Sequence, residues 1–332
     1  MADVTELTRR DGVCKTVYSI YWPFTHDLID RVWQGDRDVI HRQYEDAWTK
    51  KQDALHDPFL ERWAEWATPV QPRIARSTFP YRYPTSGSSE ALRETLADFA
   101  ANRRDNALHV FAGEYEGYEA YARGYGVRVL HHERNDWAAE HHPFQPGDVF
   151  MLSQPSAIDG NLWPAYDEFL RRMAERHPGV EIMLDLCYVG LVARDYRIEI
   201  GYPNIGRLFF SLSKIFGVYY HRIGGVFSKR EIPGLYGNMW FKNLHSIYLA
   251  RRLLDESTVR TIPDMFRPCQ EAVVRKLQNR YPTLRSSDAI LLGHHRFDAD
   301  AATDTDRLFR RDDVVRYCLA PAMETAVRGG DR

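Results

Sequence analysis

The sequence has little net charge, no long apolar run and few cysteines, and each shortage excludes a class of protein. Its 332 residues carry a formal net charge of −2, so no excess of positive charge points to nucleic acid or to an anionic membrane. No run of about 18 apolar residues occurs, and we therefore expect no transmembrane helix. The polar first twelve residues do not resemble a signal peptide, and we expect a cytoplasmic protein.

The four cysteines are Cys14, Cys187, Cys269 and Cys318, and they lie far apart in the sequence. They have neither the Cys-x-x-Cys spacing of a zinc site nor the pattern of a disulfide-rich domain. We therefore expect free thiols in a reducing compartment, and no bound metal ion.

Lysine is also scarce, with seven lysines against thirty-seven arginines. One of the seven, Lys214, stands in the apolar, aromatic and serine-rich stretch SLSKIFGVYYHRIGG, residues 211–225, and Arg222 follows eight residues later. An amine desolvated at the end of an apolar strand would have a lowered pKa and would be a nucleophile toward carbonyl groups. The alternative is a structural lysine whose stem lies along apolar surface.

Apolar periodicity predicts helices in the first part of the chain, at residues 26–66, and again at 241–281. Between them we expect strands at 107–113, 127–132, 148–155, 181–190 and 206–214, and helices at 90–103, 115–126 and 165–179. Two more strands are expected near the end of the chain, at 288–295 and 314–320. Residues 68–89, which are rich in proline, serine and arginine, are expected to be a connection without regular structure. The alternation predicts an α/β fold with a mostly parallel sheet and helices on both faces.

We expect two domains from this pattern. Residues 75–240 form a large α/β domain, while 1–74 and 241–332 form an N-terminal arm and a small domain. Ligands of such sheets bind beyond the carboxyl ends of the strands. This places the loops TSGSSE, GEYEGY, SQPSAIDGN, DLCYVG and SLSK on one rim.

Each polar residue on that rim has an ordinary structural explanation. Ser88 and Ser89 could cap a helix, Tyr115 could pack at a boundary, and Asp185 could cap the next segment. Their order along the chain is more informative than any one of them. A phosphate-type loop, an aromatic residue, a buried aspartate, Ser-x-x-Lys and then an arginine together predict a site for pyridoxal 5′-phosphate (PLP).

Residues 211–225 resemble the S-x-S-K-x-x-G-(x)-R-x-G pattern of the class I/II aminotransferase superfamily, which are fold-type I PLP enzymes. The resemblance covers about residues 80–320. It implies an aspartate-aminotransferase-like fold with a small α+β domain, in which Lys214 forms the imine with PLP and moves the Cα proton of an amino acid. It also implies a phosphate site at Gly87, Ser88, Ser89, Ser211 and Arg222, ring contacts from Tyr115, Asp185 and Tyr188, and a substrate-carboxylate contact from Arg316. Tyr115 would stack on the ring, Asp185 would bind its nitrogen, and Tyr188 would donate to its phenolic oxygen.

The sequence departs from that family in the turn SQPSAIDGN, residues 153–161, and in the short region after Lys214. Family members place an asparagine in this turn as a donor to the phenolic oxygen, whereas Ser156, Ala157 or Ile158 stands near its place here. The reaction is therefore open. We expect an aminotransferase of specialised metabolism first, a lyase that eliminates or replaces a β or γ group second, and a non-catalytic PLP sensor as a remote alternative.

The resemblance also implies a homodimer with active sites at the interface. A tyrosine of one subunit often reaches the phosphate of the other in this family, and Tyr44 and Tyr81 are candidates. The aromatic residues 18–24 either line the substrate entrance or pack on the small domain.

Overall fold

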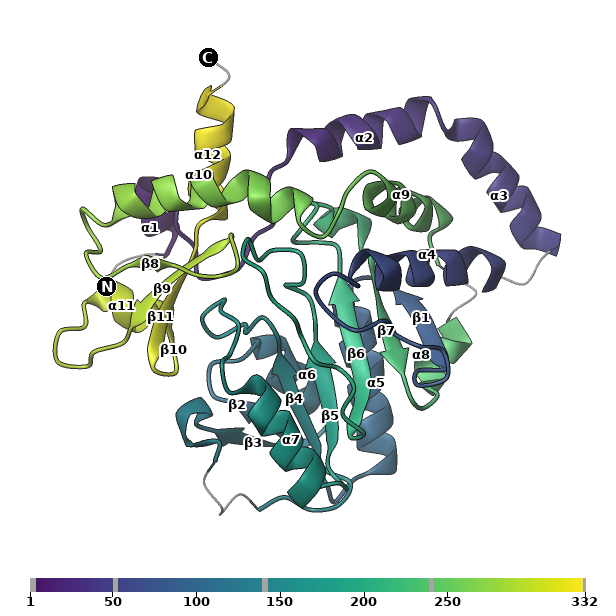
Figure 1. Cartoon of the computed structure of the whole chain (residues 1–332), viewed down its shortest axis with the longest axis horizontal. Coiled ribbons are helices and arrows are strands. Elements are labelled where there is room, and N and C mark those ends of the chain that lie inside the picture. Colours follow the sequence, from purple (N-terminus) through teal and green to yellow (C-terminus); the bar gives the residue numbers. More distant parts are fainter. Residues whose placement is uncertain (1–3, 50–52, 139–142, 239–241, 331–332) are drawn as a thin grey trace.

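The protein is described by a computed structural model that covers residues 4–49, 53–138, 143–238 and 242–330. A large sheet is flanked by helices, and a smaller sheet lies beside it together with the two ends of the chain (Figure 1). Within the described part of the chain, no helix is both long enough and apolar enough to cross a membrane.

The larger sheet has seven strands in the order β1-β7-β6-β5-β4-β2-β3. Their bounds are β1 Tyr81–Thr85, β2 Ala107–Phe111, β3 Arg128–His132, β4 Val149–Ser153, β5 Glu181–Asp185, β6 Ile205–Ser211 and β7 Gly224–Ser228. Strand β7 runs antiparallel to its neighbours β1 and β6, and all other pairs are parallel. The predicted mostly parallel sheet is confirmed.

Two strands of this sheet, β1 and β7, were not predicted. The expectation that residues 68–89 are only a connection is wrong for β1, which contains Pro84. Proline lacks the N–H of the strand ladder and is therefore confined to edge strands, and β1 is an edge strand of this sheet. Strand β7 begins with Gly224 and Gly225, which hide its strand pattern because glycine is depleted in strands.

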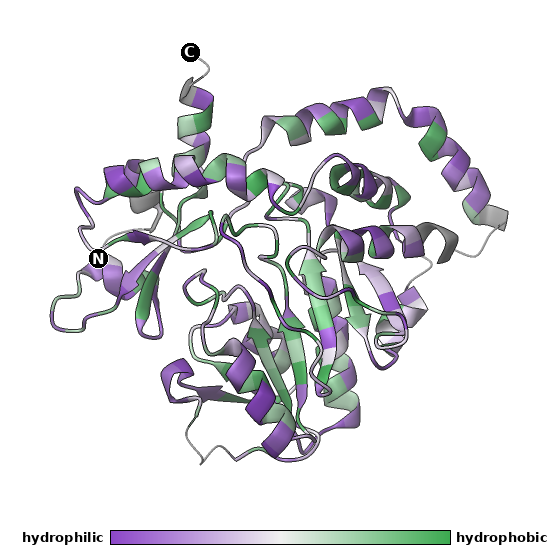
Figure 2. Cartoon of the chain, viewed as in Figure 1, coloured by the Kyte–Doolittle hydropathy of each residue, from purple (hydrophilic) through white to green (hydrophobic). Residues whose placement is uncertain are grey.

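Helices cover both faces of the sheet, as predicted. On one face lie α5 Ser88–Asn102, α6 Glu116–Gly124 and α8 Pro233–Asn238, and on the other lie α4 Asp53–Trp66, α7 Tyr166–Arg176 and α9 Leu244–Asp255. Successive side chains of β6 enter different cores: Phe209 packs with α5, whereas Phe210 stacks on Trp63 of α4 at 4.0 Å between ring centroids. The central strands are apolar along most of their length (Figure 2).

The smaller sheet is antiparallel and has the order β10-β11-β9-β8. Its strands are β8 Arg285–Ser286, β9 Leu292–Arg296, β10 Arg310–Arg311 and β11 Val314–Cys318. The remaining described α-helices are α1 Val4–Asp11, α2 Pro23–Gln34, α3 Arg37–Thr49, α10 Thr261–Leu277, α11 Asp304–Phe309 and α12 Ala320–Gly330. The N-terminal segment joins this sheet through Cys14, which exchanges two backbone hydrogen bonds with Cys318. None of the four cysteines, all of which are described, forms a disulfide bond. The division of the chain into two domains stays a prediction.

Candidate functional site

A cavity of about 310 Å³ lies at the carboxyl edge of the larger sheet. Strands β4, β5 and β6 end at this edge, and the antiparallel β7 begins there. The described residues that line the cavity are Thr16, Val17, Tyr18, Ser19, Ser88, Ser89, Tyr115, Ser153, Pro155, Ala157, Asp185, Cys187, Tyr188, Ser211, Ser213, Lys214, Tyr219 and Arg222. All five loops predicted to share one rim contribute to it.

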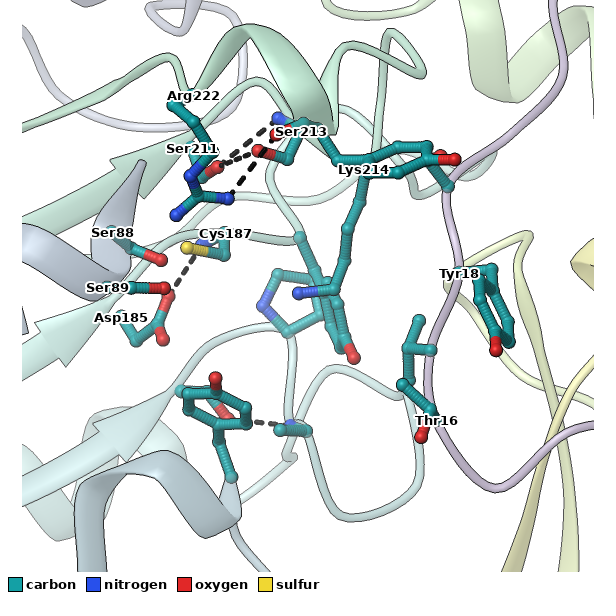
Figure 3. A pocket seen from close by; sticks show the side chains of 18 residues that line it. Thr16, Tyr18, Ser88, Ser89, Asp185, Cys187, Ser211, Ser213, Lys214 and Arg222 are labelled. Atoms are coloured by element: carbon teal, nitrogen blue, oxygen red, sulfur yellow. Dashed lines mark hydrogen bonds between the residues drawn. The ribbon is translucent and has the colours of Figure 1, made fainter. Parts of the chain in front are cut away.

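The side chain of Lys214 reaches into this cavity (Figure 3). Its Nζ lies 5.3 Å from the ring centroid of Tyr188 and 6.0 Å from that of Tyr115. Burial by itself lowers the pKa of Lys214, but the electrostatic attraction of Tyr188, Cys187, Asp185 and Tyr115 raises it above its usual value. The expected lowered pKa is therefore wrong, because acidic groups from several elements converge on this amine.

Asp185 is held in one orientation by two donors. The Tyr118 hydroxyl donates to Oδ2 at 2.7 Å, and the Cys187 backbone N–H donates to Oδ1 at 2.8 Å. Burial and the charge of Asp185 raise the pKa of Tyr118 far above its usual value, so its hydroxyl remains a donor. Tyr118 was not among the residues predicted from the sequence, although its place three residues after Tyr115 puts it one helical turn further along the chain, on α6.

Tyr115 and Tyr188 supply the aromatic surfaces of the cavity. Tyr115 is the N-cap residue of α6, and its ring packs against Gly117, where any Cβ would collide with it. Its ring meets Tyr118 edge to face, with centroids 5.4 Å apart. Tyr188 is buried, and burial raises the pKa of its hydroxyl, which keeps it a hydrogen-bond donor. The face of Tyr115 could stack on a planar ligand.

The other end of the cavity collects donors for an anion. Ser88 begins α5, whose first N–H groups have no side-chain cap, and Arg222 reaches the same place from the turn before β7. Arg222 Nη2 donates to the Ser86 carbonyl at 2.8 Å, and the hydroxyls of Ser211 and Ser213 lie 3.0 Å apart (Figure 3). This combination of a helix N-terminus, hydroxyls and a guanidinium group suits a phosphate dianion.

Gly87 is not among the described residues that line the cavity, but it leaves room for the Arg222 guanidinium beside the start of α5. Its φ is 72° and its ψ is 173°, a conformation that is essentially restricted to glycine. A Cβ at this position would lie 2.8 Å from Arg222 Nη2. Gly87 thus serves the site through space and backbone conformation, and its predicted part in holding a phosphate stays a prediction. Ser213 and Cys187 line the cavity but were not among the predicted site residues.

The N-terminal segment closes the opposite side of the cavity. Tyr18 and Thr16 face it (Figure 3), and the Ile20 N–H donates to the Lys214 carbonyl at 3.1 Å. Trp22 is instead buried and stacks on Phe216, with centroids 6.3 Å apart. Tyr18 thus lines the cavity, whereas Trp22 packs on Phe216, which lies within residues 75–240. A substrate entrance lined by residues 18–24, or their packing on the small domain, stays a prediction.

Arg316 lies behind the wall of the cavity, close enough to Tyr188 to lower the pKa of that hydroxyl against the larger effect of burial. It is 4% exposed and does not line the cavity as the described residues define it. Its Nη1 donates to the carbonyl of Ala157, which does line the cavity, and Nη2 donates to the Lys15 carbonyl at 3.3 Å. The dimer candidates Tyr44, on α3, and Tyr81, at the start of β1, are both exposed.

Neither a protein-family model nor a curated protein sequence matches this chain. Solved structures do match along most of its length. A probable N-succinyldiaminopimelate aminotransferase from Thermus thermophilus matches 99% of this chain with 97% of its own, at 18% identity and a TM-score of 0.66. An aminotransferase from Staphylococcus aureus matches 96% of this chain with 92% of its own, at 12% identity and a TM-score of 0.67.

The chain has the fold of the class I/II aminotransferases. The aminotransferase fold also includes lyases, since a PLP-bound C–S lyase from Staphylococcus hominis matches 82% of this chain with 80% of its own, at 11% identity and a TM-score of 0.62. The predicted fold is confirmed, and this fold alone does not choose between the two reactions.

Proposed function

We propose that this protein is a PLP-dependent enzyme that acts on a free α-amino acid, with transamination as its reaction. The observation that carries the proposal is the meeting of three groups in one cavity. The Lys214 amine, the fixed carboxylate of Asp185 and the anion-binding cluster around Arg222 come from separate segments of the chain. No ordinary structural role requires an amine, a carboxylate and a phosphate-type cradle to share a cavity.

The residues fit the chemical groups of PLP one by one. The cavity of about 310 Å³ is of a size typical of small-molecule sites. The cluster of Ser88, Ser89, Ser211 and Arg222 suits the phosphate, the Tyr115 face suits the ring, and Asp185 suits a protonated ring nitrogen. We assign Tyr188 to the phenolic oxygen of the ring.

When bound, PLP supplies a carbonyl group that combines with amines and a ring that withdraws electrons from Cα. Lys214 would provide the amine that holds the cofactor, and its free amine would carry the proton at Cα of the substrate. Asp185, fixed by Tyr118, keeps the proton on the ring nitrogen. Arg316 is assigned to the substrate carboxylate, which requires that it exchange its contacts with the Ala157 and Lys15 carbonyls.

An eliminating lyase is the second candidate. Elimination needs a group that assists departure of a β or γ substituent, in addition to the residues that remove the Cα proton. The N-terminal wall offers the hydroxyls of Thr16, Tyr18 and Ser19 to the cavity, and a C–S lyase has this fold. A PLP sensor without turnover is a remote third reading.

We also propose that the enzyme is a homodimer in a reducing cytoplasm. Tyr219 and Tyr220 support an interface near the anion cluster, because they stand just before Arg222 and are 40% and 83% exposed. Tyr44 and Tyr81 stay candidates for a contact with the partner's phosphate site. Light scattering of the purified protein measures the assembly directly.

The deciding experiment is an absorbance spectrum of the protein with PLP, followed by the addition of amino acids one at a time. The proposal predicts a visible band that Lys214→Ala abolishes and Lys229→Ala leaves intact, since Lys229 bonds the Pro203 carbonyl away from the cavity. Oxo-acid release with loss of the band identifies transamination, whereas ammonia release with a persistent band identifies elimination. Absence of a Lys214-dependent band would overturn the proposal.

A further inference from the structure

The cavity wall formed by Ser153, Pro155 and Ala157 has no side-chain amide, yet a buried carboxylate stands directly behind it. Glu114 Oε1 accepts the Ser153 N–H at 3.1 Å, and Oε2 accepts the Ser153 hydroxyl at 2.7 Å. The Ser153 Oγ in turn accepts the Ala157 N–H at 2.6 Å. The roles proposed above for the cavity residues leave both Glu114 and Ser153 unused.

The donor and acceptor capacity of Ser153 makes this pair a switch. A serine hydroxyl has one hydrogen and two lone pairs. With Glu114 ionised, the hydrogen is directed to Oε2, and the cavity meets no donor from Ser153. With Glu114 protonated, the carboxyl donates to Ser153 Oγ, the Ala157 N–H occupies the second lone pair, and the hydroxyl hydrogen is released toward the cavity.

We propose that Ser153 is a hydrogen-bond donor to the phenolic oxygen of bound PLP, and that Glu114 is the positioning residue whose protonation turns the Ser153 hydrogen into the cavity. The inference rests on the proposed PLP function. It assigns to Ser153 the donor role of a side-chain amide, because the two amides of the turn 153–161 do not line the described cavity. Gln154 accepts the Trp163 N–H and Asn161 accepts the Asp288 N–H instead.

The surroundings of Glu114 place its titration near neutral pH. Burial, the largest influence, and the charge of Asp185 raise the pKa of Glu114 to about 7, against the opposing effects of the Ser153 hydrogen bonds and Arg134. The titratable or charged groups that face it are Arg134 from the segment after β3, Asp185 from β5, Tyr118 from α6 and Arg311 from β10. Arg134 is itself paired with Asp159 at 2.7 Å, which limits its hold on Glu114.

The test is a pH titration of the visible absorbance of bound PLP. Ser153→Ala should raise the midpoint of this titration by about one pH unit, the size expected for losing one hydrogen bond to a charged oxygen. The reason is that a less stabilised phenolic oxygen holds more tightly the proton that it shares with the Lys214 nitrogen. Glu114→Gln should lower the midpoint, since its amide donates to Ser153 Oγ at every pH. Ser156→Ala is the matched control: Ser156 sits in the same turn but bonds Arg134 and does not line the described cavity.

Glu114→Gln also removes a negative charge, and this alone would lower the midpoint of the absorbance titration. The double variant Ser153→Ala/Glu114→Gln therefore decides whether Glu114 acts through Ser153 or through its charge. The effect of Glu114→Gln should shrink when residue 153 is already alanine. An equal shift in both backgrounds overturns the positioning role, and equal midpoints for Ser153→Ala and Ser156→Ala overturn the donor role. A Lys214-dependent band with unmoved midpoints leaves the proposed function standing, whereas absence of that band in the wild type overturns both.

Discussion

The phenolic oxygen of Tyr118 lies 2.7 Å from Oδ2 of Asp185, and this contact joins a helix on one face of the sheet to the end of β5. Tyr118→Phe removes a hydrogen bond to a charged group, and such bonds contribute about 1.5–3 kcal/mol. We therefore expect kcat/KM to fall about tenfold or more and PLP to bind more weakly. Steady-state kinetics and a PLP titration followed by absorbance measure both effects.

Tyr121→Phe provides the control for that substitution. Tyr121 lies on the same helix, α6, and is half-buried outside the cavity defined by the described residues. Its loss of a hydroxyl should leave kcat/KM and PLP affinity near wild type. Equal losses in Tyr118→Phe and Tyr121→Phe would mean that the Asp185 contact has no special role.

Gly87→Ala should weaken PLP binding by about tenfold or more. The backbone conformation of Gly87 costs other residues about 1–3 kcal/mol, and a new Cβ would also displace the Arg222 guanidinium, which would lie 2.8 Å away. Gly124→Ala is the matched control, because no described atom lies within 4 Å of its Cβ position. Comparable PLP dissociation constants for the two variants would contradict the assigned phosphate site.

The parts of the site that the sequence predicted come from short motifs at strand ends. Ser211, Lys214 and Arg222 lie within one segment of fifteen residues, and Asp185 and Tyr188 lie within another of four. In an α/β sheet such segments must meet at the carboxyl edge, so order along the chain was enough to predict that they share a cavity.

The parts that were missed depend on contacts between segments. Tyr118 and Glu114 act on partners in β5 and at the end of β4, and no local spacing specifies which side chains those strands bring within reach. The pKa of Lys214 was predicted in the wrong direction for the same reason, because its surroundings combine residues from several elements. Strand β1 was missed because Pro84 marks a connection in most contexts.

The raised pKa of Lys214 predicts that PLP capture by the cofactor-free protein accelerates with pH. Only the neutral amine attacks a carbonyl group, and well below the pKa its fraction grows about tenfold per pH unit. Stopped-flow absorbance after mixing with PLP should therefore give a rate that rises throughout the range from about pH 6 to 9. A rate that reaches a plateau near neutral pH would indicate an amine with a lowered pKa instead.

Arg316→Ala should raise KM for the amino acid by about tenfold or more, because a bidentate carboxylate contact is lost. The visible PLP band should persist, since Arg316 does not line the described cavity. The competing role is structural, because Arg316 bonds the Ala157 and Lys15 carbonyls in this structure. An unchanged KM with a lowered Tm would assign Arg316 to that structural role alone.

The final prediction concerns stability and involves Asp148, a buried carboxylate at the opposite end of β4 from the cavity. Its two oxygens accept hydrogen bonds from Ala107 N, Asn106 Nδ2, Gln145 N and, in the appropriate tautomer, His109 Nε2, at 2.8–3.0 Å. Asp148→Asn replaces one acceptor oxygen with a donor group and leaves buried donors unmatched. We expect the free energy of unfolding to fall by about 3 kcal/mol at neutral pH.

The pH dependence of that loss follows from the pKa of Asp148. Burial opposes its ionisation, but the hydrogen bonds from Ala107, Asn106 and Gln145 lower the pKa below its usual value. The carboxylate therefore stabilises the fold above the unfolded-state pKa of about 3.9, and this contribution disappears as the pH falls through the lower folded-state value. Denaturant unfolding should show the gap between wild type and Asp148→Asn narrowing below about pH 4. The exposed Asp105, at the turn before β2, supplies the control, and an equal loss in Asp105→Asn would contradict this assignment.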